Sequence, residues 1–295
     1  MTDYRIITDA TCDMNLDILE RFHIDVIPME VTMDDGRTFL HYPDFRNFAA
    51  EDFYNQLNEG NYSKSSQITP QQYLDFFSPI LASGNDILYV CFSSGLSGSY
   101  QSALHAQAQL QEQFPERTLI IIDSLCACTG EGVLAVQAGI NKEELGMSLE
   151  ENATWLEENK LHVTHFFTVG DLFLLHKGGR VNAASAVMGT VLNIKPILIV
   201  DEEGKLVVVN KVRGRKTALK KLLEMTRASI QNPENQVIYI AQANCMEDAL
   251  WLKDLTEKEI PCKEVVITGI GPVVGTHTGE THMCMHCFGA GRQPV

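Results

Sequence analysis

Runs of apolar residues alternate along the chain with segments of helical periodicity. An uninterrupted run such as 87–92 is typical of a strand that is buried on both faces, as in a parallel sheet covered by helices. We predict strands at 4–8, 87–92, 118–123, 162–169, 237–243 and 264–268, and helices at 15–22, 50–57, 70–81, 100–110, 124–138, 149–159, 183–189 and 246–258. Strands that alternate with helices in this way predict an α/β fold with right-handed crossovers.

Two segments depart from this alternation and predict β-hairpins. Residues 25–33 alternate partly between apolar and polar side chains and end at the turn 34–36, whose sequence is Asp-Asp-Gly. A second hairpin is expected from 196–200 and 205–209, which flank a polar turn ending in Gly204. We therefore predict two domains. Residues 1–160 form a parallel sheet flanked by helices, and residues 161–295 form an α/β domain with a mixed sheet.

Charge and composition narrow the range of functions. With 45% hydrophobic and 21% charged residues, the chain has the composition of a soluble globular protein, and its net charge of −15 argues against binding nucleic acid or an anionic membrane surface. The polar start predicts no signal peptide, and Asn193 and Lys195 interrupt the longest apolar stretch. We expect a cytoplasmic protein without a stable membrane anchor.

Hydroxyl groups and glycines follow the run at 87–92, in the sequence Ser-Ser-Gly-Leu-Ser-Gly-Ser of residues 93–99. A turn between a strand and a helix N-terminus is a place where α/β proteins bind anions. Three interpretations compete. Ser94 or Ser97 can cap the helix, a serine can act as a nucleophile although the spacing G-x-S-x-G is absent, or the turn can hold a carboxylate or phosphate.

Soft ligands gather near the C-terminus, where His282, Cys284, His286 and Cys287 lie within six residues. A Cys-x-x-Cys pair can bind zinc or cycle as a disulfide, but the chain has no second such pair, and thiols of a buried core are the other interpretation. The glycines of 269–279 do not match G-x-G-x-x-G, and no Walker motif occurs. We assign no metal and no cofactor.

One basic cluster stands out in this acidic chain. It spans 211–216 and continues to Lys220 and Lys221. Such a cluster is commonly a solvated helix face, and the alternative is a docking patch for an anionic partner or a phosphate.

Six short motifs occur in order along nearly the whole chain. Taken together they resemble the DegV family of bacterial fatty-acid-binding proteins, which includes lipid-binding subunits of fatty acid kinase. The resemblance implies two α/β domains with a long-chain fatty acid of the palmitate or oleate class buried between them, and its carboxylate at the turn after the central strand. The motifs lie at 8–11, 64–67, 93–100, 177–181, 211–214 and 271–279.

The resemblance also implies roles for individual residues. Those expected near the carboxylate are Ser65, Ser66, Ser93, Ser94, Thr276 and His277. An ATP-dependent fatty acid kinase is the implied partner, with Arg180 and Arg213 on the docking face. The chain departs from the family after Gly279, because Glu280 and a His/Met/Cys-rich segment stand where the family continues with Pro-Gly and an apolar strand.

Lipid binding without catalysis is therefore the expected function. Hydroxyl groups, helix N–H groups and an imidazole can offset the cost of burying a carboxylate. The alternative is a hydrolase or acyltransferase in which Ser93 or Ser94 is the nucleophile, His277 the base and Asp9 a third member.

Overall fold

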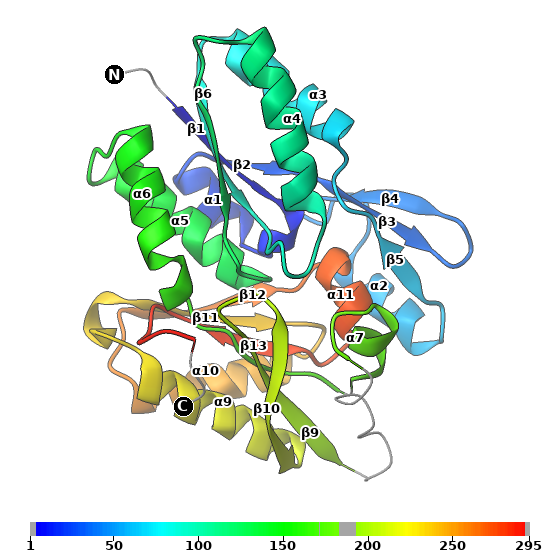
Figure 1. The fold of residues 1–295 in the computed structure, drawn as a ribbon. Helices are drawn as coiled ribbons and strands as arrows, with labels where there is room; N and C mark the ends of the chain where they lie inside the picture. Colours follow the sequence, from blue (N-terminus) through cyan, green and yellow to red (C-terminus); the bar gives the residue numbers. More distant parts are fainter. Residues whose placement is uncertain (1–3, 171, 183–192, 293–295) are drawn as a thin grey trace.

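Two sheets of different topology form the framework of the chain (Figure 1). The computed structural model describes residues 4–170, 172–182 and 193–292, so the helix predicted at 183–189 lies outside the described residues. The first sheet has four strands in the order β2-β1-β6-β7, and every pair in it is parallel. Its central strand β6 is buried along its whole length, as its apolar sequence predicts. The strands are β1 (Tyr4–Asp9), β2 (Ile24–Ile27), β6 (Asp86–Cys91) and β7 (Leu119–Asp123).

Helices cover both faces of this first sheet. On one face lie α3 (Pro70–Ala82) and α4 (Ser99–Gln113), and on the other lie α1 (Leu16–Arg21), α5 (Thr129–Glu143) and α6 (Leu149–Asn159). The prediction of a helix from residue 124 is wrong for its first turn. Leu125 and Cys128 adopt left-handed backbone angles, with φ of 51° and 53°, so 124–128 form a loop and α5 begins at Thr129.

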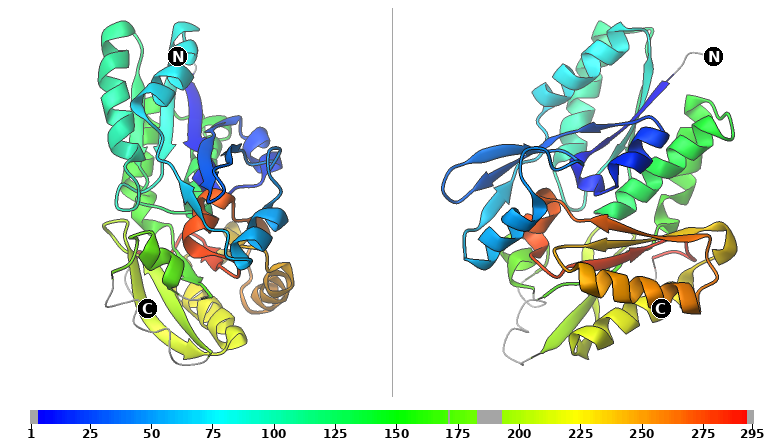
Figure 2. Two further views of the ribbon diagram at one scale, coloured as in Figure 1. Left: turned by 90° about the vertical axis from the view of Figure 1, so that its right-hand side faces the viewer. Right: turned by 180° about the vertical axis from the view of Figure 1, so that it is seen from behind.

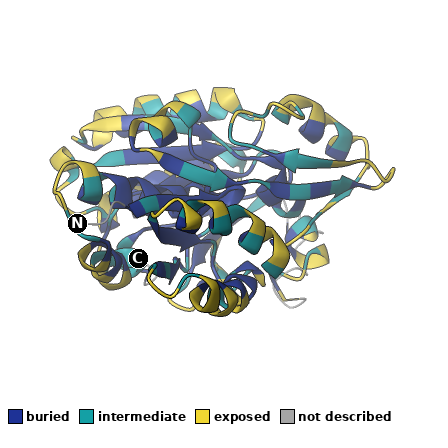
Figure 3. Cartoon of the chain, turned by 90° about the horizontal axis from the view of Figure 1, so that it is seen from above, coloured by how far each residue is buried: buried dark blue, intermediate teal, exposed yellow. Residues whose placement is uncertain are grey.

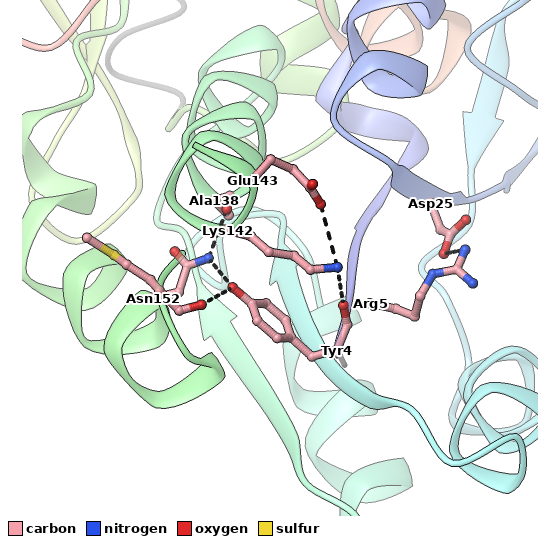
Figure 4. A network of polar contacts seen from close by, with 8 residues as sticks. Tyr4, Arg5, Asp25, Ala138, Lys142, Glu143 and Asn152 are labelled. Atoms are coloured by element: carbon pink, nitrogen blue, oxygen red, sulfur yellow. Dashed lines mark hydrogen bonds and ion pairs between the residues drawn. The ribbon is translucent and has the colours of Figure 1, made fainter. Parts of the chain in front are cut away.

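A network of hydrogen bonds connects α5 and α6 to Tyr4, the first residue of β1 (Figure 4). The hydroxyl of Tyr4 accepts a hydrogen bond from the Asn152 amide at 3.0 Å, and the same amide donates to the carbonyl of Ala138 at 2.8 Å. Lys142 donates to the carbonyl of Tyr4 at 2.8 Å. Because Asn152 is fully buried, these bonds satisfy an amide that would otherwise destabilise the core.

The second sheet is mixed and has six strands in the order β10-β9-β8-β13-β11-β12. Only β11 and β12 pair in parallel, and the predicted hairpin is the antiparallel pair β9–β10. The prediction of a strand at 162–169 is too long, since β8 keeps only its last part. The strands are β8 (Phe166–Thr168), β9 (Ile194–Val200), β10 (Leu206–Arg213), β11 (Val237–Gln242), β12 (Glu264–Gly269) and β13 (Met283–His286). One face packs against α9 (Arg215–Ser229) and α10 (Met246–Glu259).

A small antiparallel sheet and three short helices lie beside the junction of the two large sheets (Figure 2). The first hairpin is confirmed as β3 and β4, and β5 pairs with the other edge of β3. Helix α11 packs against α7, α2 and β5, which brings together segments far apart in the sequence. These elements are β3 (Met29–Met33), β4 (Thr38–His41), β5 (Ser63–Ser65), α2 (Ala50–Asn58), α7 (Phe173–Lys177) and α11 (Pro272–Thr278).

The largest hydrophobic cluster joins the two halves of the chain. It contains Ile7 and Tyr89 from the first sheet together with Leu198 and Cys284 from the second. Figure 3 shows the buried residues gathered on the strands and the exposed ones on the outward faces of the helices. The chain passes from the first sheet to the second between α6 and β8. The domain boundary at residue 160 stays a prediction. Within the described ranges, none of the helices has the length and apolar character to cross a bilayer.

Candidate functional site

A cavity of about 220 Å³ lies between the two large sheets. Both halves of the chain contribute to it, from β3, β5, β8, β9, β10, β13, α7 and α11 and from the turn after β6. Much of the wall is apolar, and its described apolar residues include Met29, Phe92, Leu96, Ala127, Phe167, Leu175, Val200, Leu206, Val273 and Val274. An elongated apolar molecule is the kind of ligand that such a wall accepts.

Ser65 and His277 form a polar pair in the wall of this cavity. The Ser65 hydroxyl and Nε2 of His277 lie 2.8 Å apart. Ser65 ends β5 and His277 lies in the last turn of α11, so the packing of α11 on β5 creates the pair. The resemblance to the family places both residues near a carboxylate, and the structure brings them together.

Arg180 lies on the same side of the cavity as His277. Its Nε donates to the carbonyl of Leu96 at 3.2 Å, and another guanidinium nitrogen donates to the carbonyl of Gly178. Burial, followed by the charge of Arg180, lowers the pKa of His277 to about 4. The imidazole is therefore neutral at pH 7, and Arg180 is the cation at this end of the cavity.

The close approach of His277 to the chain explains a glycine in the motif 177–181. A Cβ atom at Gly178 would lie 2.5 Å from Nδ1 of His277. Any other residue at 178 would push the imidazole away from its place beside Ser65. Arg180, which the sequence analysis predicts to lie on a docking face, lines the wall of the cavity, and its docking role stays a prediction.

The turn after β6 contributes residues other than the two serines that the sequence indicated. Leu96, Ser97 and Gly98 line the cavity, but Ser93 and Ser94 are not among the lining residues. The buried Ser93 hydroxyl donates to the carbonyl of Gly204 at 2.8 Å and thereby fastens the turn to the β9–β10 hairpin. The side chain of Ser94 is exposed. Neither hydroxyl meets His277, because the turn faces the cavity with its later residues.

The cap interpretation of this turn is also only partly right. The N-cap position of α4 is Gly98, which has no side chain. The Ser97 hydroxyl accepts a hydrogen bond from the backbone N–H of Ser99 at 3.2 Å, so it supports the helix entrance from one position earlier.

Of the three remaining predicted residues, Ser66 alone belongs to the described wall of the cavity. Thr276 faces β5, where its hydroxyl lies 2.7 Å from the hydroxyl of Ser63, and it also donates to the carbonyl of Pro272 at 2.8 Å. Thr276 therefore holds α11 against β5. The exposed Arg213 lies at the end of β10 and is not among the residues that line the cavity.

Two carboxyl groups lie behind Thr11, another residue of the cavity wall. The Thr11 hydroxyl contacts the carboxyl groups of both Asp9 and Glu131, the latter at 2.8 Å. Both carboxyl groups are fully buried, and burial raises the pKa of each. The Thr11 oxygen therefore links the two carboxyl groups in one shared network. Asp9 is occupied in this network and does not orient His277.

The C-terminal motif forms β13 in the centre of the second sheet, and this separates the two thiols of the Cys-x-x-Cys pair. Side chains alternate along a strand, so His282, Cys284 and His286 line the cavity while Cys287 packs in the core under α9 and α10. The two cysteines face opposite sides. All eight cysteines are free thiols, and the described part of the chain has no group of three potential metal ligands.

Comparison with known proteins identifies the fold. The family model named DegV, described as an uncharacterised protein of the DegV family, matches residues 3–287. This chain belongs to the DegV family. A DegV domain-containing protein of Clostridium perfringens is 34% identical over 294 residues, which is 100% of each chain.

Solved DegV structures share this architecture. The solved structure of a DegV family protein from Thermus thermophilus, which concerns its fatty acid binding, matches this chain with a TM-score of 0.86 at 26% identity. The match covers 98% of this chain and 100% of that one. A fatty-acid-binding DegV family protein from Streptococcus agalactiae gives 0.84 at 27% identity, covering 97% and 99%. The predicted DegV-like fold, with its parallel and mixed sheets, is confirmed.

Proposed function

We propose that this DegV protein binds a long-chain fatty acid of the palmitate or oleate class in the cavity between the two sheets, without catalysing a reaction itself. The observation that carries the proposal is an apolar cavity with Ser65, His277 and Arg180 together in its wall. Fatty-acid-binding relatives of the same fold support it.

The chemistry of the ligand fits this arrangement. Each methylene that leaves water contributes about 0.8 kcal/mol, so ~15 methylenes contribute ~12 kcal/mol before the cost of ordering the chain. A carboxylate buried without partners would be costly. Arg180 supplies the opposite charge and Ser65 a hydroxyl donor, while His277, neutral at pH 7, can donate from one ring nitrogen. Anchoring therefore comes from the acyl chain and selectivity from the carboxylate.

Organic extraction of the purified protein followed by mass spectrometry tests this function. We expect a stoichiometric C14 to C18 fatty acid, or binding of an added one by protein from which lipid has been removed. A protein that yields no such lipid and also fails to bind added palmitate and oleate would contradict the proposal.

The place of Ser65, Arg180 and His277 in the cavity supports a second part of the proposal. In this part, the protein presents the carboxylate to an ATP-dependent fatty acid kinase. Ser65, Arg180 and His277 also line a neighbouring pocket of about 310 Å³, together with Lys64 and Lys177. Both lysines are exposed, so this pocket faces solvent. A partner enzyme would then reach the carboxylate from this side while the acyl chain stays buried. A cytoplasmic location, where such a kinase finds ATP, remains a prediction.

Arg213 remains the predicted docking residue outside the cavity. We expect Arg213→Glu to weaken kinase-dependent formation of acyl phosphate while the lipid content of the protein stays unchanged, because charge complementarity acts on association. Lys258→Glu, a charge reversal at an exposed residue of α10, is the matched control. Equal kinase activity for both variants would exclude Arg213 from the docking face, and loss of lipid in Arg213→Glu would assign it a structural role.

The serine-hydrolase alternative finds no support in the geometry. The buried Ser93 hydroxyl is held by Gly204, and the imidazole nitrogen that would act as the base is paired with Ser65. A fluorophosphonate probe that labelled Ser93 or Ser94 would nevertheless favour catalysis.

A further inference from the structure

Two histidines in the wall of the cavity, one at the end of β13 and one directly before it, have buried ring nitrogens without a hydrogen-bond partner in the described part of the chain. His282 and His286 both line the cavity, and their side chains are 4% and 0% exposed. Both ring nitrogens of His282 and Nε2 of His286 lack a partner among the described residues. A buried polar atom without a partner costs roughly 1–3 kcal/mol, so a purely aliphatic ligand would leave this strand unsatisfied.

The hydrogen bonds of His286 fix which of its nitrogens is available. Its Nδ1 lies 3.0 Å from the carbonyl oxygen of Thr164, and since a carbonyl can only accept, Nδ1 carries the proton. Burial lowers the pKa of His286 to about 4, so the ring is neutral at pH 7 and its Nε2 is an acceptor. A ligand group beside Nε2 must therefore donate a hydrogen bond, as a hydroxyl does and as a ketone, an ether or a double bond does not.

A third histidine in the same wall, His165, has hydrogen-bond partners for both of its ring nitrogens. His165 lies against His286 with ring centroids 4.9 Å apart. Its Nδ1 donates to the carbonyl of Val163 and its Nε2 accepts from the N–H of Ala127, both at 3.1 Å. The chain thus completes the hydrogen bonds of His165 with its own backbone, whereas within the described ranges it leaves both ring nitrogens of His282 and Nε2 of His286 without a partner.

The position of these residues along β13 sets them apart from the carboxylate site. Cys284 and His286 of β13 line the cavity together with His282, which directly precedes the strand, so the two histidines lie about 13 Å apart along an extended backbone. They follow α11 in the chain and lead away from His277. A carboxylate held at Ser65 and His277 therefore places the body of an acyl chain, not its head group, along β13.

We propose that the preferred ligand is a hydroxylated fatty acid, whose mid-chain hydroxyl group donates to Nε2 of His286 or pairs with His282. This inference rests on the proposed fatty-acid binding and names its substrate class. It also assigns a role to the segment after Gly279, where polar residues stand in place of the apolar strand expected from the family.

Competition binding with lipid-free protein compares ligands of equal length. We expect 10-hydroxystearate or 12-hydroxystearate to bind at least tenfold more tightly than stearate, the effect of one hydrogen bond to a buried acceptor. The isomer 2-hydroxystearate, whose hydroxyl stays beside the carboxylate, should show no such preference. His286→Phe and His282→Phe test the two histidines separately. His105→Phe, at an exposed position of α4, is the control.

Each outcome decides between the two levels of the proposal. A tenfold preference in the unchanged protein and in His105→Phe that disappears in His286→Phe or His282→Phe, with stearate affinity kept, supports the inference. Equal binding of stearate and the mid-chain hydroxystearates overturns it, because water then satisfies the imidazoles, and leaves fatty-acid binding intact. Preference that survives both His286→Phe and His282→Phe also overturns it. Failure to bind any of these lipids overturns the proposed function itself.

Discussion

His277→Ala is expected to weaken the binding of palmitate or oleate by tenfold to hundredfold while the protein still folds. The imidazole pairs with Ser65 at 2.8 Å in the cavity wall. Removing it leaves a buried carboxylate with one partner fewer, which costs ~1–3 kcal/mol. Competition with a fluorescent fatty acid measures the loss, and thermal unfolding without lipid checks the fold.

Ser65→Ala and the double variant show whether the pair acts as a unit. We expect Ser65→Ala to weaken binding by a similar factor, and the double variant to lose less than the product of the two single losses, because the residues contact each other. Ser94→Ala is the informative control, since the sequence placed Ser94 near the carboxylate and the structure exposes its side chain. Unchanged affinity in both His277→Ala and Ser65→Ala would remove the proposed carboxylate site.

Three strands of the first sheet, β1, β6 and β7, could be predicted from sequence because each is a largely apolar run with clear ends. The fourth, β2, was instead predicted as part of the hairpin at 25–33. In 86–91 every residue is buried, so hydrophobicity alone marks the strand. The loop at 124–128 was missed because its left-handed residues are Leu125 and Cys128, neither of which signals such a conformation.

Only part of the site could be predicted from sequence, because its residues meet through tertiary packing. The resemblance placed Ser65 and His277 in one site, but no local pattern shows which hydroxyls of the turn 93–99 face the cavity. Ser97 lines the cavity and Ser93 bonds to Gly204 because of how the turn sits against the β9–β10 hairpin. The contribution of the half-buried Arg180 to the cavity wall was not predicted, because a cation beside two glycines gives no signal for it.

The Cys-x-x-Cys spacing left a metal or redox site open as one interpretation, and the geometry of a strand argues against it. Three residues along a strand reverse the direction of the side chain, so Cys284 and Cys287 cannot share a ligand once 283–286 are a strand. The period of the surrounding sequence, with Met283 and Met285 on one face and His282, Cys284 and His286 on the other, was the signal that could have shown this.

Asp13→Asn is expected to stabilise the protein increasingly as the pH rises from 6 to 8. Asp13 is 7% exposed, and its Oδ1 accepts from the N–H of Gly271 at 2.8 Å, a contact between the two halves of the chain. Its Oδ2 has no partner among the described residues. Burial raises the pKa of this carboxyl group from 3.8 to about 8.

The direction of the effect follows from proton linkage. Between these two values the unfolded chain has lost the Asp13 proton and the folded protein has kept it, so rising pH favours unfolding. Each pH unit lowers the free energy of unfolding by about 1.4 kcal/mol, or roughly 2–3 kcal/mol between pH 6 and pH 8. Asparagine keeps the acceptor for Gly271 and has no proton to lose, so the difference between variant and parent grows by this amount.

Comparison of the two proteins at each pH isolates Asp13 from the other buried groups. Burial lowers the pKa of histidines such as His41 and His277 to about 4, so they stabilise the fold as the pH rises towards their ordinary value of 6.5. This contribution is common to both proteins and cancels in the difference. Denaturant unfolding at pH 6, 7 and 8 measures the difference in the free energy of unfolding. Asp17→Asn, at an exposed position of α1, is the control. Parallel pH profiles for Asp13→Asn and the parent would show that Asp13 is already ionised in the folded protein.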